Sequence, residues 1–146
     1  MALVQLDVVP DVGHVRVARL VAVSLARVNG VDEEVVEDVR LAVGEACGRA
    51  VAAHSRAALD EPVRLRFEGD ADAGPGMRVE IVDRVAMPEA DGEAALALLV
   101  GGQTPAAARA EAGAASAVMA LLEGLADEVQ VHTGTQGTTV ELRWND

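Results

Sequence analysis

The fold of this chain is organised around the stretch VRLAVGEACGRAVAAH, residues 39–54. It has no proline and no glycine run long enough to end a helix. Its apolar residues fall on more than one side, so we expect a largely buried helix. Two charged residues in it, Glu45 and Arg49, are four positions apart and therefore lie on the same face of the helix. What this face contacts should decide the function.

The composition sets the class of protein. A length of 146 residues predicts one domain over residues 1–146, and 51% hydrophobic with 25% charged residues is typical of a globular chain. The net charge of −12 argues against nucleic acid, because no basic face can neutralise phosphates, and against an anionic membrane surface. No leader peptide and no uncharged apolar run of membrane-spanning length is visible, which predicts a cytoplasmic protein.

Two helices are expected in the first half of the chain, over about 12–28 and from Asp32 to as far as Ala58. Asn29-Gly30 supplies a stop signal for the first helix, and Asp32 is a good N-cap for the second. Helical spacing predicts the buried face of the first helix: Val17, Leu20, Val21, Ser24, Leu25 and Val28. The more solvent-exposed face of this helix is expected to carry Arg16, Arg19 and Arg27.

Strands are expected where apolar residues alternate with polar ones: 3–9, 63–67, 77–82, 128–132 and 138–144. A turn-rich segment joins strand 63–67 to strand 77–82, and another joins strand 128–132 to strand 138–144. Two hairpins are therefore predicted. Between the hairpins the pattern is weaker, with a short helix over 93–100 and a helix over 114–126. The order β-α-α-β-β-(short α)-α-β-β predicts the α+β class, a sheet with helices on one face.

The remaining chemistry-bearing residues show no site pattern. His14, His54 and His132 are far apart and have no acidic or cysteine partner at metal-ligand spacing, so no metal site is expected. Cys47, the only cysteine, lies on the buried helix, where packing is its expected role.

Three segments occur in the order found in one known family. RLAVGEACGRAV at 40–51 is similar to a helix that carries Glu and, four residues on, Asn; VEIVD at 79–83 is similar to a strand ending in Asp. LEGLADEV at 122–129 followed by GTTVEL at 137–142 is the most specific match. Over nearly its whole length the chain resembles the anti-sigma-factor serine kinases of the GHKL (Bergerat-fold) ATPases. The resemblance implies a histidine kinase-like ATPase domain, a two-layer α/β sandwich whose mixed sheet is mainly antiparallel.

The resemblance also implies roles for single residues. Glu45 matches the general base, and Asp83 matches the Asp that holds the adenine amino group. Gly113 is the one glycine near the phosphate-cradling positions, and Thr138 follows the late Gly-Thr turn. Read from the residues alone, Glu45 fits a helix-surface ion pair, Asp83 a turn cap at a strand end, and Thr138 an ordinary strand position.

Departures from the family pattern argue against ordinary ATP chemistry. Arg49 stands where the family binds Mg²⁺, and a guanidinium has no lone pair for a metal. Its charge could contact phosphate directly in place of the ion, but pairing with Glu45 is the expected contact. Val85 and Met87 stand where the family has glycine and would fill the adenine pocket, and the phosphate positions read ASAV at 115–118.

The sequence therefore predicts a regulatory protein that keeps the scaffold, has lost or weakened ATP binding, and needs no cofactor. By resemblance, it would switch between a sigma factor and a STAS-domain anti-anti-sigma factor and would form a homodimer. The partner surface is expected on the first strand and first helix, at Arg16, Arg19 and Arg27. The alternatives are an active serine kinase that phosphorylates the STAS partner with ATP and Mg²⁺, and a structural subunit without a switching role.

Overall fold

The computed structural model describes residues 2–70, 72–92, 94–95 and 120–145. A helical turn at residues 120–125 precedes the last two strands. The other elements, in chain order, are β1 (Ala2–Val8), η1 (Val12–His14), α1 (Val15–Val28), α2 (Glu33–Arg56), β2 (Val63–Gly69), β3 (Met77–Val82), β4 (Ala90–Asp91), β5 (Glu128–Gly134) and β6 (Gly137–Trp144).

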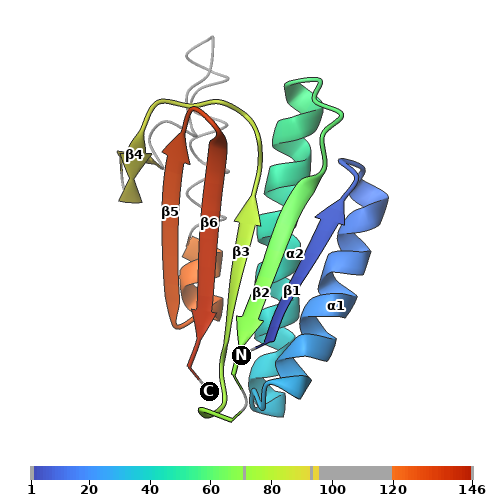
Figure 1. Cartoon of the computed structure of the whole chain (residues 1–146), viewed down its shortest axis with the longest axis vertical. Helices are drawn as coiled ribbons and strands as arrows, with labels where there is room; N and C mark the ends of the chain where they lie inside the picture. Colours follow the sequence, from blue (N-terminus) through green and yellow to red (C-terminus); the bar gives the residue numbers. More distant parts are fainter. Residues whose placement is uncertain (1, 71, 93, 96–119, 146) are drawn as a thin grey trace.

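The strands form one six-stranded sheet in the order β1-β2-β3-β6-β5-β4. Every neighbouring pair in it is antiparallel, so both predicted hairpins are present. Figure 1 shows α1, α2 and the helical turn at 120–125 on one face of this sheet. The predicted α+β class and the two-layer sandwich with helices on one face are therefore confirmed.

The strand predictions agree with the structure to within two residues at each end. β3 has the predicted bounds, and β2 and β5 each extend two residues further than the alternation indicated. β4 was not predicted, because a strand of two residues is too short to show an alternating pattern. It pairs with β5 and forms the far edge of the sheet.

The long helix α2 forms where the sequence predicts it. The Asp32 side chain accepts a hydrogen bond from the backbone N–H of Glu34 at 3.2 Å, which caps the helix start as expected. The helix ends at Arg56, two residues before the furthest predicted end. It is buried on several sides, as its sequence indicates, and packs against β2 and β3. Its fully buried residues include Val39, Ala42, Val43, Ala46, Cys47, Ala50, Val51 and His54.

The buried face predicted for α1 is correct only in part: Val21 and Leu25 are half-buried against the core, but other predicted residues are exposed. Val17, Leu20 and Val28 are 43%, 61% and 67% exposed. The buried residues of α1 are instead Val15, Ala18, Ala22 and Ala26. Small side chains let α1 approach α2 closely, and at that distance the bulkier aliphatic residues do not fit between the two helices. Val17, Leu20 and Val28 are therefore left at the surface.

Several predictions fall on residues that the structure does not describe. These are most of the helix expected over 93–100, the start of the helix expected over 114–126, and the candidate phosphate glycine Gly113. None of the helices in the described part of the chain combines the length and the apolar character that a membrane span requires.

Candidate functional site at the end of strand β3

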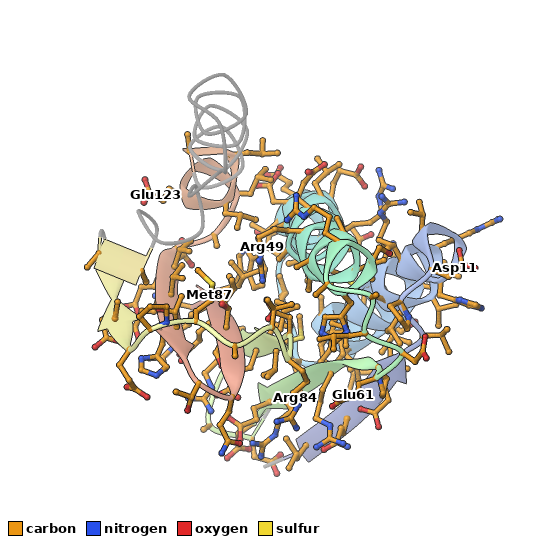
Figure 2. The ribbon with its side chains drawn as sticks, turned by 90° about the horizontal axis from the view of Figure 1, so that it is seen from above. Asp11, Arg49, Glu61, Arg84, Met87 and Glu123 are labelled. Atoms are coloured by element: carbon orange, nitrogen blue, oxygen red, sulfur yellow. The ribbon has the colours of Figure 1, made fainter. Side chains whose placement is uncertain are left out.

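An ion pair between Arg49 and Asp83 joins α2 to the end of β3. The Nη2 atom of Arg49 lies 2.5 Å from Oδ2 of Asp83. The Asp83 side chain is only 1% exposed and that of Arg49 is 17% exposed. Figure 2 shows Arg49 extending from α2 over the sheet, on the same side as Met87. Two residues that the sequence predicts to belong to a nucleotide site are thus brought into direct contact.

The second carboxylate oxygen of Asp83 is also occupied. Its Oδ1 accepts hydrogen bonds from the backbone N–H of Val85 at 2.9 Å and of Thr138 at 3.3 Å. The backbone N–H of Asp83 donates to the carbonyl of Thr138 at 2.9 Å. Charge-assisted bonds of this kind are the stronger class of hydrogen bond, so the carboxylate is held firmly by donors from three parts of the chain.

Gly137 allows this arrangement because it lies directly against the Asp83 backbone. Its φ of +127° belongs to the region that favours glycine. A Cβ atom on it would lie 1.8 Å from the carbonyl oxygen of Asp83. The Gly-Thr-Thr-Val segment, the most specific part of the family resemblance, is therefore the part of β6 that contacts Asp83.

His54 holds the residue after Asp83 and was not predicted to belong to the site. Its Nε2 accepts the backbone N–H of Arg84 at 2.8 Å, and its Nδ1 donates to the carbonyl of Glu61 at 2.8 Å. These two bonds fix a neutral ring with the proton on Nδ1. The ring is fully buried. A lone histidine on a buried helix has no local pattern that would identify its distant partners.

The predicted contact between Glu45 and Arg49 is wrong. Glu45 is exposed and forms no ion pair with any residue in the described part of the chain. Arg49 contacts Asp83 instead. A surface pair at i,i+4 contributes only about 0.2–0.5 kcal/mol, whereas a buried carboxylate without a counter-charge costs several times more. The long-range pair therefore prevails over the local one.

The segment after β3 is fixed along the β5–β6 hairpin. The backbone N–H of Met87 donates to the carbonyl of Gly134 at 2.9 Å, and the Thr133 hydroxyl donates to the carbonyl of Pro88 at 2.8 Å. Val85 and Met87 are both half-buried. They stand where the family resemblance requires glycine, and Figure 2 shows Met87 between the hairpin and α2.

The side chains at this site do not fit Mg²⁺ and ATP in the way the resemblance implies. A guanidinium takes the place of the metal ligand, and both oxygens of Asp83 already accept bonds from the chain. Nε of Arg49 and Oγ1 of Thr138, two residues that bond to this carboxylate through other atoms, are buried and have no hydrogen-bond partner among the described residues. Nowhere in the described residues do three or more His, Cys, Asp or Glu gather in a way that could hold a metal ion.

Cys47 is not a reactive thiol. Burial raises its pKa to about 11, although the nearby positive charge of Arg19 opposes this in part. The thiol is therefore protonated at neutral pH, and it is fully buried. Its role is packing, as the sequence predicts.

The three arginines of α1 lie in different surroundings. Arg16 is exposed and forms no ion pair among the described residues. Arg27 pairs with Glu33 through a 2.6 Å contact. Arg19 is half-buried, and its side chain lies over Gly44 of α2, where a Cβ atom would be 2.4 Å from its Nε. Only Arg16 is thus both exposed and without a counter-charge in this part of the structure.

Comparison with known proteins places the chain in a family. The sequence model described as the histidine kinase-like ATPase domain matches residues 8–144. No curated protein matches the sequence. Among solved structures, the RsbU and RsbW domains of Rv1364c from Mycobacterium tuberculosis have a similar fold, with a TM-score of 0.63 at 17% identity. The match covers 99% of this chain and 32% of that one, so the chain spans about a third of that structure. The chain belongs to the histidine kinase-like ATPase domain family.

Proposed function

We propose that the chain is a regulatory protein of the anti-sigma-factor kinase type that has lost ATP-dependent phosphorylation. It acts by partner switching: a sigma factor and a STAS-domain anti-anti-sigma factor compete for overlapping surfaces, as differential affinity allows. The observation that carries the proposal is the Arg49–Asp83 ion pair, which occupies the candidate nucleotide site. Family membership and the RsbW-like fold support the choice of regulatory class.

The charges and contacts at Asp83 support the proposed loss of ATP binding. A nucleotide would have to displace Arg49 from a carboxylate that is only 1% exposed. It would also meet the half-buried side chains of Val85 and Met87. Mg²⁺ would approach a fixed guanidinium charge. Each of these effects weakens Mg·ATP binding, and they act together.

The surface for protein partners is the apolar outer face of α1, here called the α1 surface: Val17, Leu20 and Val28, which are 43%, 61% and 67% exposed. Val12 of the preceding turn η1 is 78% exposed, and Figure 1 shows α1 and the edge strand β1 at the same edge of the molecule. Contiguous exposed apolar residues mark interaction sites. Arg16 adds a positive charge to this surface in a chain of net charge −12. It would attract an acidic partner.

Replacing Leu20 by glutamate is expected to weaken partner binding by at least about tenfold, because it places a charge in the middle of an apolar contact. Binding is measured by calorimetry against sigma factors and STAS-domain proteins from the same genome. Leu121→Glu is the matched control. Leu121 is 43% exposed and lies on the helical turn at 120–125, away from α1. If the unaltered chain binds neither class of protein, the partner-switching proposal is wrong.

A second candidate is an active serine kinase, and one observation favours it. The Glu45 carboxylate is exposed and unpaired among the described residues, so it is free to accept a proton from an attacking hydroxyl. In this case Arg49 would have to leave Asp83 when the nucleotide binds.

Adding ATP and Mg²⁺ at about 1 mM is expected to raise the melting temperature by no more than about 2 °C. A site with a Kd near 1 μM would instead be stabilised by about 4 kcal/mol at this concentration. That corresponds to a rise of roughly 10 °C in a chain of this size. A rise of this order, together with phosphate transfer to a STAS-domain serine, would establish the kinase and exclude the loss of ATP binding.

A further inference from the structure

The environment of Asp83 resembles a ligand complex in which the ligand is a side chain of the protein. Its carboxylate is 1% exposed and accepts two backbone N–H donors at Oδ1. Arg49 is the one side chain among the described residues that donates to it, and it does so at Oδ2. The Arg49 side chain is 17% exposed, so part of it is in contact with solvent while its end group binds the buried carboxylate.

The fit between Arg49 and its surroundings is incomplete. Arginine and carboxylate commonly pair through two parallel hydrogen bonds. Within the described residues a single contact is made, from Nη2, and the buried Nε has no partner. The Thr138 hydroxyl is also buried and has no partner in this same part of the chain. Thr138 is 1% exposed and its backbone N–H donates to the same carboxylate. Polar binding capacity at this place is therefore larger than Arg49 uses.

We propose that Arg49 occupies a binding socket at Asp83 and serves as a ligand that the chain supplies to itself. Without Arg49, the socket presents Oδ2 of Asp83 as a charged acceptor and the Thr138 hydroxyl as a further donor or acceptor. It suits a small planar cation with N–H donors, of the amidinium or guanidinium class. The inference rests on the proposed function in one respect, that the nucleotide site is closed by the chain itself.

The socket is tested by removing the Arg49 side chain by mutation and supplying its guanidinium group as a small molecule. The variant Arg49→Ala is titrated with methylguanidinium to about 10 mM, a concentration with negligible denaturing effect. A rise in melting temperature of about 4 °C is expected once the probe exceeds its Kd by about tenfold. Methylammonium at the same concentration carries the same charge without the planar donors and controls for ionic strength.

Two matched variants show whether the effect belongs to Asp83. In Arg49→Ala combined with Asp83→Asn, methylguanidinium should have no effect, because the charged acceptor is gone. In Arg64→Ala, which opens the exposed pair between Arg64 and Asp7, it should also have none. If Arg49→Ala is unfolded at 25 °C, the same titration is followed by circular dichroism, and recovery of the helical signal is the supporting result.

The outcomes separate this inference from the proposed function. A stabilisation specific to Arg49→Ala and to methylguanidinium supports the socket. No stabilisation and no recovery of the fold, or an equal effect on the unaltered chain or on the double variant, overturns it. Partner binding by the unaltered chain is measured independently, so a failed socket leaves the partner-switching proposal standing and the reverse also holds.

Discussion

Replacing Arg49 by alanine is expected to lower the free energy of unfolding by about 3 kcal/mol at neutral pH. The substitution leaves the carboxylate of Asp83, 1% exposed, with its two backbone donors and without a counter-charge. Removing one partner of a buried ion pair is costly for this reason, even where the complete pair contributes little. Urea unfolding followed by circular dichroism gives the measurement.

The same chain offers an exposed pair for comparison. Arg64 and Asp7 have side chains that are 38% and 40% exposed, so Arg64→Ala should cost less than about 1 kcal/mol. A double-mutant cycle of Arg49→Ala with Asp83→Asn should give a coupling energy of about 1–3 kcal/mol. Equal losses for Arg49→Ala and Arg64→Ala, with no coupling to Asp83, would show that the buried pair does not hold α2 to β3.

The partner of Arg49 shows why the site could be predicted only in part. The sequence singles out both residues of the ion pair as candidates, because Arg49 and Asp83 lie in the segments that carry the family resemblance. Their contact was not, because it joins residues 34 positions apart. The i,i+4 spacing predicted a contact between Arg49 and Glu45, but the Glu45 side chain is exposed to solvent. Spacing along a helix shows which residues share a face, but not which neighbouring element that face meets.

Helix α1 shows the same limit for the fold. Its bounds were predicted well, since Asn29-Gly30 ends it and Gly30 has a φ of +72°. Its buried face was predicted only in part. Both the large apolar residues and the alanines at 18, 22 and 26 recur at helical spacing, and the larger ones were taken as the core. Alanine occupies the buried face because α2 packs closely against α1. The pattern of residues within α1 does not show this close packing.

The β-strands were the most predictable part, for a physical reason. One face of this antiparallel sheet packs on the helices while the other meets solvent, so each long strand carries an alternation that can be seen locally. β3 and β6 alternate between buried and half-buried residues throughout. His54 is the opposite case, because its role depends on Arg84, which is 30 positions away.

Replacing Gly137 by alanine is expected to cost at least about 4 kcal/mol and to leave little folded protein. The new Cβ atom would lie 1.8 Å from the carbonyl oxygen and 2.7 Å from the carbonyl carbon of Asp83. These are backbone atoms, so no rotation of a side chain relieves the contact. The φ of +127° adds strain for any residue with a Cβ. Soluble yield and thermal unfolding of the purified variant measure the effect.

Gly48→Ala is the matched control for Gly137→Ala. Gly48 lies inside α2, next to Arg49, and apart from its own helix no described residue lies within 4 Å of the place where its Cβ would stand. Alanine is favoured over glycine in a helix interior by up to about 1 kcal/mol, so this variant should be slightly more stable than the parent chain. If Gly137→Ala were equally well tolerated, β6 could not lie against the Asp83 backbone as described. The contacts that hold the Asp83 carboxylate would then need another explanation.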